Sequence, residues 1–228
     1  EIISADSRQV YRGMDIGTGK DLNEYNINGK KIPYHLIDIM DPKEEYSVFQ
    51  FQKDFQVEFI NIQKREKIPI LCGGTGLYIK AILMNFHLPA VAPNKTLRKK
   101  LEDWQLEDLI KELESISPGS SKYNLIDTKR RIIRAIELEL DKNGRKIKNK
   151  HHNLIFGIEN PLVIGIEYPR EIIRRRITER LKYRIAQGMV TEVEHLISDG
   201  ITHKKLDAFG LEYRFISQYL TEKINKNE

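Results

Sequence analysis

The N-terminal part of the chain alternates short apolar runs with amphipathic stretches. The segments EIISA (1–5), IPYHLIDI (32–39) and IPILC (68–72) are apolar runs of strand length. After Ser47, a typical helix N-cap residue, and after GGTG (73–76), apolar residues recur at spacings of three and four, which predicts helices. The order strand, helix, apolar strand, glycine turn and helix is typical of a parallel α/β sheet.

The strand-like runs stop after Phe86. Residues 96–141 are charged and helix-periodic, interrupted by the loop SPGSS at 117–121. A polar, basic loop, DKNGRKIKNKHHN (141–153), follows. This part of the chain is therefore predicted to be helical.

A strand-type run returns at LVIGI (162–166), and Pro169 then starts a helix with isoleucines and leucines on one side. We therefore predict two domains. Residues 1–90 and 161–228 form an α/β core, and residues 91–160 form an all-helical insertion.

Composition narrows the class of protein. The 228 residues contain 38 Lys+Arg and 33 Asp+Glu, a net charge of +5, and 40% hydrophobic residues, enough for a sizeable core. No apolar run approaches the ~20 residues of a spanning helix, and one cysteine cannot form an internal disulfide. We expect a cytoplasmic protein without a membrane partner. Cys72 ends a predicted strand and is expected to be a small core residue.

A carboxylate follows the first predicted strand. Asp6 and Ser7 come directly after EIISA, and α/β proteins bind ligands at the carboxyl ends of parallel strands. Asp6 could accept a proton from a substrate or hold a metal-bound water. Alternatively, it caps the next turn with support from Ser7.

The glycine turn at 73–76 could bind an anion. A strand, small residues and a helix start direct backbone N–H groups at an anion, and Thr75 adds a hydroxyl. The same turn also serves for close strand-to-helix packing. It lacks the Lys-Ser/Thr ending of a P-loop.

Positive charge gathers in two places. Arg176, Arg180 and Arg184 lie four residues apart beside the apolar stripe of the helix after Pro169. They could grip a phosphate bidentately, or form a solvated face with Glu179 as a local partner. The predicted insertion carries a second cluster, typical of a polyanion surface, made of Arg98, Lys99, Lys100, Lys129, Arg130, Arg131 and Arg134.

Taken together, five segments resemble the tRNA dimethylallyltransferase (tRNA isopentenyltransferase) family. They are SADSRQVYRGMDIGTGK (4–20), HLID…DP…YSV…F (35–51), PILCGGTGLYIKA (69–81), RRIIRAIE (130–137), and RITER with QGMVTEV (176–193). The first and third segments are long and specific, and all five occur in the family's order.

The resemblance implies a P-loop NTPase-like fold, of the class that binds ATP and other nucleotides, with a parallel sheet flanked by helices. It implies transfer of a dimethylallyl group from dimethylallyl diphosphate to N6 of the adenine on the 3′ side of the anticodon, releasing diphosphate. The implied cofactor is Mg²⁺, and the partner is the anticodon stem-loop of tRNA. We expect a monomer.

The resemblance also implies roles for particular residues. Asp6 would be the general base that deprotonates the amine, Thr75 would lie beside it, and Arg180 with Arg176 would hold the diphosphate. Contacts to tRNA are implied for Asp6, Ser7, Arg8, Gln9, Thr75, Arg98, Arg130, Arg131 and Arg134.

The family's P-loop, whose Lys and Ser/Thr serve the diphosphate and Mg²⁺, is expected on a strand–turn–helix before Glu1. The 228 residues by themselves are therefore expected to bind tRNA weakly and transfer almost nothing, and they contain no identified metal ligand. The alternatives are an adenylate isopentenyltransferase acting on free adenine nucleotides, a P-loop kinase of small metabolites, and a non-catalytic RNA-binding module. The basic insertion argues against the first, because a mononucleotide needs no wide polyanion platform.

Overall fold

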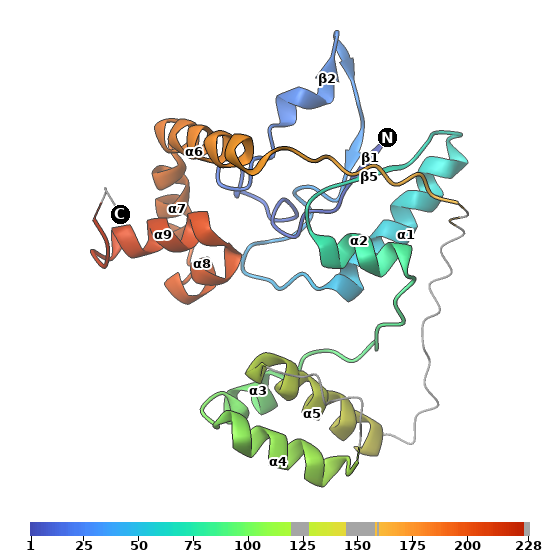
Figure 1. Cartoon of the computed structure of the whole chain (residues 1–228), viewed down its shortest axis with the longest axis vertical. Helices are drawn as coiled ribbons and strands as arrows, with labels where there is room; N and C mark the ends of the chain where they lie inside the picture. The colour runs from blue at the N-terminus through green and yellow to red at the C-terminus, as the bar shows by residue number, and fades with distance from the viewer. Residues whose placement is uncertain (120–127, 145–157, 159, 226–228) are drawn as a thin grey trace. The chain divides into compact units, whose positions relative to one another are not determined.

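The computed structural model describes residues 1–119, 128–144, 158 and 160–225. These residues belong to two compact units (Figure 1). The first comprises residues 1–86 and 154–228, and the second comprises residues 87–153. The second unit thus lies a few residues earlier in the chain than the predicted insertion, 91–160.

A short parallel sheet forms the centre of the first unit. Its middle strand, β1 (Ile2–Ser4), pairs in parallel with β4 (Tyr34–His35) on one side and β5 (Ile70–Cys72) on the other. The remaining described elements between β1 and β4 are a 3₁₀ helix and an antiparallel strand pair, η1 (Leu22–Tyr25), β2 (Asn26–Ile27) and β3 (Lys30–Lys31). A parallel sheet flanked by helices confirms the predicted fold class.

Two helices cover the sheet. They are α1 (Val48–Lys64) and α2 (Gly76–Leu83), and both pack into the core that contains Ile3 of β1. The N-terminus of α1 has the capping box expected from Ser47, because Ser47 Oγ accepts from Gln50 N–H and Gln50 Oε1 accepts from Ser47 N–H. Both helices were predicted from the apolar spacing.

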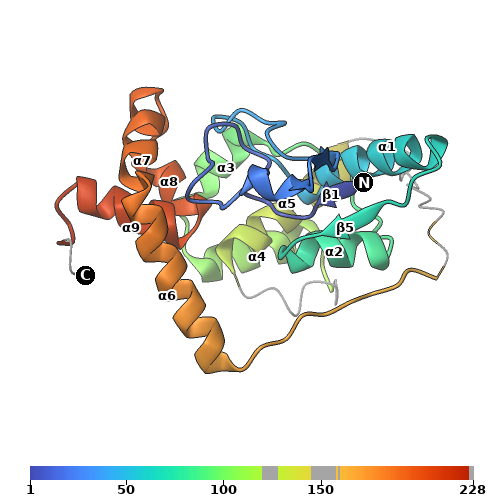
Figure 2. The same ribbon diagram turned by 90° about the horizontal axis from the view of Figure 1, so that it is seen from above.

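The C-terminal part of the first unit is helical. Its described helices are α6 (Arg170–Ala186), α7 (Met189–Ser198), α8 (His203–Phe209) and α9 (Leu211–Leu220). Figures 1 and 2 both show α7, α8 and α9 side by side. They form a core with the segment after β1, because Val10 and Met14 are buried among Val193, Leu206 and Tyr213. This core brings the two sequence-distant parts of the unit together.

The second unit is helical in its described part. Helices α3 (Lys95–Leu101), α4 (Leu106–Ile116) and α5 (Lys129–Gly144) pack around Leu109 and Ile132. Residues 120, 121 and 145–153 of the two predicted loops lie outside the described residues. None of the helices in the described ranges is long and apolar enough to cross a bilayer.

Three details of the strand prediction were wrong. Residues 162–166 form no strand: Figure 2 shows an extended trace leading into α6, and Ile164 is 77% exposed. Within the described ranges no strand pairs with this run, and an apolar run becomes a strand only beside a partner. The run 32–39 yields only the short β4, because Leu36 and Asp38 have positive φ angles (63° and 57°), which a strand does not accommodate. Cys72 is exposed rather than in the core, because β5 is an edge strand of the three-stranded sheet.

Candidate functional site

The chain turns directly after β1, and Asp6 caps this turn. Asp6 Oδ1 accepts hydrogen bonds from the backbone N–H groups of Arg8 at 2.7 Å and Gln9 at 3.3 Å. The capping role that the sequence left open is therefore present. Neither bond uses Oδ2, so the half-buried carboxylate still has an oxygen for other chemistry.

The glycine turn between β5 and α2 packs closely on the end of β1. A Cβ atom on Gly73 would lie 2.5 Å from the carbonyl carbon and oxygen of Ala5, and Thr75 N–H donates to Ala5 O at 3.1 Å. Thr75 Oγ1 accepts from Ser7 N–H at 3.0 Å. The glycine at 73 is thus explained by packing, and the turn brings Thr75 next to the Asp6 turn.

A cavity of about 360 Å³ opens beside the Asp6 turn. Its lining comes from the segment after β1 and from α6, α8 and α9, and consists of Asp6, Arg8, Gln9, Gly17, Thr18, Gly19, Asp21, Arg180, Arg184, Phe209, Glu212 and Tyr213. The structure therefore gathers Asp6 and Arg180, which are far apart in the sequence, around one cavity. Ser7 and Thr75 adjoin it through the hydrogen bonds of the Asp6 turn.

The arginine stripe of α6 is desolvated only at its C-terminal end. Arg184 is buried, and its Nη1 donates to Gly17 O at 3.3 Å. Burial, followed by the neighbouring charge of Arg180, lowers the pKa of Arg184 below its ordinary value. Arg180 and Arg176 are exposed, and Arg176 lies over the ring of Tyr168 at 4.2 Å instead of lining the cavity. The apolar stripe beside these arginines is likewise not buried: Ile177 is 49% exposed.

The loop DIGTGK (15–20), for which the sequence predicted no particular role, organises the cavity wall. Lys20 is buried, and its Nζ donates to Tyr11 O at 2.7 Å, to Asp15 Oδ1 at 2.6 Å and to Asp38 Oδ1. Gln9 Nε2 donates to Gly19 O at 3.1 Å. The signal in the sequence was the motif DIGTGK, in which two glycines and a lysine follow an aspartate.

Gly19 is required by its surroundings. Its φ angle is +62°, and a Cβ atom there would overlap the guanidinium of buried Arg184. Only glycine allows the loop and Arg184 to approach this closely.

We expect Gly19→Ala to destabilise the protein by more than Gly13→Ala. Gly13 also has a positive φ angle (+72°), but no atom lies within 4 Å of a Cβ built there. Both variants carry the backbone cost of roughly 1–2 kcal/mol, and Gly19→Ala adds about 1–3 kcal/mol for displacing Arg184. Denaturant unfolding of both variants measures the difference, and equal free energies of unfolding would contradict this account.

In the second unit, a buried carboxylate holds two of the predicted tRNA-binding arginines. The side chain of Glu137 is 1% exposed, and it accepts hydrogen bonds from Arg98 Nε at 2.7 Å and Arg134 Nη1 at 2.9 Å. Burial by itself would raise the pKa of Glu137, but the hydrogen bonds from Arg98 and Arg134 outweigh it and bring the pKa below its ordinary value. Arg130 and Arg131 are exposed on α5. Of the four arginines of the second unit with a predicted tRNA contact, two are therefore held by Glu137 and the other two, Arg130 and Arg131, are exposed.

An α/β sheet with a carboxylate after its central strand and arginines around the same cavity fits the class of group-transfer enzymes that act on phosphate compounds. Comparison with known proteins makes the class specific: the model of the family described as IPP transferase matches residues 9–228. The chain belongs to this family, which confirms the resemblance seen in the sequence.

Relatives with established names are similar over the whole chain. A tRNA dimethylallyltransferase 2 of Bacteroides fragilis is 45% identical over 228 residues, which are 100% of this chain and 73% of the relative. A tRNA dimethylallyltransferase 2 of Syntrophotalea carbinolica is 43% identical, again over 100% of this chain and 74% of the relative.

Solved structures share the fold. The tRNA isopentenylpyrophosphate transferase of Bacillus halodurans superposes with a TM-score of 0.63 at 31% identity, covering 100% of this chain and 71% of that one. A eukaryotic dimethylallyltransferase acting on tRNA has a TM-score of 0.68 at 20% identity, covering 98% of this chain and 62% of that one, and supports the fold alone.

Proposed function

We propose that this protein transfers a dimethylallyl group from dimethylallyl diphosphate to N6 of the adenine 3′-adjacent to the anticodon in tRNA, and releases diphosphate. Membership of the IPP transferase family and the names of the relatives support the reaction. The single observation on the structure that carries the proposal is the cavity lined by both Asp6 and Arg180. A carboxylate for the amine and an arginine for the leaving group are two of the parts that this chemistry needs.

Asp6 is the proposed general base. N6 of adenine is a poor nucleophile, so its proton must leave as the new C–N bond forms between N6 and C1 of the dimethylallyl group. The proton passes to the Asp6 carboxylate, while the C1–O bond breaks and its electron pair leaves with diphosphate. A positioned base typically contributes ~10²–10⁴-fold to the rate. Thr75 is proposed to contact the target base, since its hydroxyl is bonded to the turn that Asp6 caps.

Arg180 is the proposed ligand of the diphosphate. Its guanidinium offers a planar fork of donors that matches phosphate oxygens. Arg184, next along the cavity wall, adds a second positive charge. Arg176 remains in the proposal as a more distant contributor, because its guanidinium lies on Tyr168.

Mg²⁺ is the proposed cofactor. The described residues include no group of three or more His, Cys, Asp and Glu side chains that could hold a metal. Mg²⁺ is usually bound by one or two carboxylates together with phosphate oxygens and water. Asp6 and Asp21 line the cavity, and Oδ2 of Asp6 takes no part in capping the turn. We assign the ion no ligand among the described residues.

The tRNA is proposed to contact the Asp6 turn with Ser7, Arg8 and Gln9, and the arginines of the second unit. When Lys and Arg of a protein neutralise the phosphates of a nucleic acid, counterions are released from the nucleic acid, so the affinity depends on the salt concentration. Arg98 and Arg134 are included, but their orientation is set by Glu137. A cytoplasmic monomer stays a prediction from the sequence.

Replacing Arg130 and Arg131 by alanine is expected to weaken binding of an anticodon stem-loop and to flatten its salt dependence. Each lost phosphate contact removes about one unit from the slope of log K against log salt. Lys111→Ala is the control, because Lys111 is an exposed cation of α4 outside the patch. An unchanged slope in the double variant would show that the patch is an ordinary solvated face.

The choice of acceptor tests the proposed function. The full natural protein, incubated with labelled dimethylallyl diphosphate, should modify an anticodon stem-loop with an adenine 3′ of the anticodon and leave AMP unmodified. The same stem-loop with guanine at that position is the matched control. Transfer to AMP alone would favour an adenylate isopentenyltransferase, and ATP turnover without prenyl transfer would favour a kinase.

A further inference from the structure

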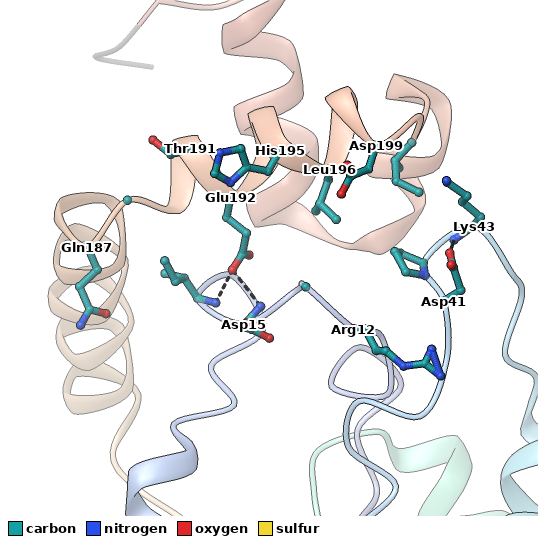
Figure 3. A pocket seen from close by; sticks show the side chains of 15 residues that line it. Arg12, Asp15, Asp41, Lys43, Gln187, Thr191, Glu192, His195, Leu196 and Asp199 are labelled. Atoms are coloured by element: carbon teal, nitrogen blue, oxygen red, sulfur yellow. Dashed lines mark hydrogen bonds between the residues drawn. The ribbon is translucent and has the colours of Figure 1, made fainter.

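One carboxylate receives hydrogen bonds from three consecutive backbone N–H groups. Glu192, on α7, accepts from Asp15 N–H at 2.8 Å and from Ile16 N–H at 2.6 Å, the two dashed bonds of Figure 3. It also accepts from Gly17 N–H at 3.1 Å. The hydroxyl of Tyr213 on α9 donates a fourth bond at 2.8 Å. Both carboxylate oxygens are thus engaged, and bonds to an ionised acceptor are about twice as strong as neutral ones.

The Tyr213 hydroxyl stays a donor across the neutral pH range. Its ring is buried against Gly17, where a Cβ atom would lie 2.6 Å from the hydroxyl oxygen. Burial, and then the charge of Glu192, raises the pKa of Tyr213 above its ordinary value. The phenol therefore does not ionise beside the carboxylate.

The loop held by Glu192, residues 15–19, is connected by hydrogen bonds to Arg184 and, through Gln9, to Asp6 of the proposed transfer site. Arg184 Nη1 donates to Gly17 O, so the loop fixes one arginine of the cavity wall. Gln9 Nε2 donates to Gly19 O at 3.1 Å, and the backbone N–H of Gln9 donates to Asp6 Oδ1. A relay of hydrogen bonds thus runs from Glu192 through the loop to the proposed base.

Glu192 itself does not line the cavity of Asp6. It borders a separate cavity of about 880 Å³, shown in Figure 3 with Arg12, Lys43 and His195 among its lining residues. Glu192 is therefore placed to act on the reaction through the loop and not by touching substrate.

We propose that Glu192 is a positioning residue for dimethylallyl transfer, because it holds the 15–19 loop in the conformation that aligns Gln9 with Asp6 and Arg184 with the cavity wall. This inference rests on the proposed function. Misplacing reacting groups by about 1 Å can cost ~10²-fold in rate, so a loosened loop affects turnover more than binding.

The test is Glu192→Gln in the full natural protein, with Glu194→Gln as the matched control. Glu194 lies on the same helix but is exposed. Glutamine keeps the size of Glu192 but replaces one acceptor oxygen with an NH₂ group that faces backbone donors. We expect kcat to fall at least tenfold while KM for the anticodon stem-loop changes less than threefold, and Glu194→Gln to behave as the parent. Tyr213→Phe, which removes one donor only, should give a smaller decrease in kcat.

A double variant separates positioning from simple loss of stability. If Glu192 acts through the relay, Glu192→Gln should lower kcat by a smaller factor in a Gln9→Ala background than in the parent, because only the branch through Arg184 then remains. Independent effects that multiply would overturn the proposal, as would an unchanged kcat per folded molecule, with folding checked by circular dichroism. If the parent itself transfers no dimethylallyl group, the proposed function fails; if the parent is active and Glu192→Gln is equally active, only this inference fails.

Discussion

Asp6→Ala is expected to lower kcat for dimethylallyl transfer by about 10²–10⁴-fold, the usual contribution of a general base. The dissociation constant for the anticodon stem-loop should change by no more than a few fold, because most of the affinity comes from phosphate contacts elsewhere. Single-turnover transfer and stem-loop binding, measured on the same preparation, check both parts.

Asp6→Asn separates the proton transfer from the capping of the turn. The amide oxygen of asparagine can still accept from the N–H groups of Arg8 and Gln9, as Asp6 Oδ1 does, but it cannot take up a proton from the amine. We expect Asp6→Asn to be as inactive as Asp6→Ala. Its midpoint of denaturant unfolding should equal that of the parent. Asp6→Ala should lose about 0.5–1.5 kcal/mol of stability for each hydrogen bond removed. A nearly parental rate for the asparagine variant would remove Asp6 from the mechanism.

Glu137→Ala is expected to be the most destabilising of the charge-removing substitutions in the second unit. It leaves Arg98 and Arg134 without their shared carboxylate, and breaking a buried pair costs ~3–5 kcal/mol. The value should lie at the low end of that range, because the two arginine side chains are 32% and 30% exposed. Hydrogen exchange of the amides in α3 and α5 of the whole protein measures the loss within this unit. Glu114→Gln, at an exposed position of α4, is the control.

The contact of Glu137 with Arg98 and Arg134 predicts that the stability of the second unit depends on pH. The pKa of Glu137 is lowered in the folded protein, so the stability that the carboxylate contributes is fully present above the unfolded-state pKa of about 4.3. It is lost progressively as the pH falls below that value. Protection of the α5 amides should therefore decrease as the pH falls below about 4.3 in the parent, and decrease less in Glu137→Gln. An equal decrease in both would assign the acid sensitivity to other groups.

Features that depend on local sequence were predictable. The helix after Ser47 follows from its capping residue and apolar spacing, and Asp6 was recognised because the end of a parallel strand is a defined place for chemistry. The strand predicted at 162–166 failed because pairing depends on a neighbouring strand, which no local pattern reveals. Cys72 is exposed for a related reason, since the position of β5 at the sheet edge is a property of the whole sheet.

The residues that support the site through hydrogen bonds could not be predicted from a single sequence. Glu192 lies 177 residues from Asp15, and neither is unusual in its own segment. Arg98 and Arg134 were assigned to a basic cluster from the sequence. The carboxylate that binds both, Glu137, lies on α5 among apolar residues, and only the packed structure shows that it is buried. A contact that joins distant segments is decided by tertiary packing and leaves no periodic signal.

The placement of the helical unit within the chain has a consequence for the entropy of folding. Residues 87–153 lie inside the 177-residue loop that the contact between Asp15 and Glu192 closes. Because closure entropy grows only with the logarithm of loop length, closing 177 residues instead of about 110 costs only ~0.4 kcal/mol more. The core therefore tolerates a unit of this size at almost no thermodynamic penalty. The length of the second unit can therefore change with little effect on the free energy of closing the core around it.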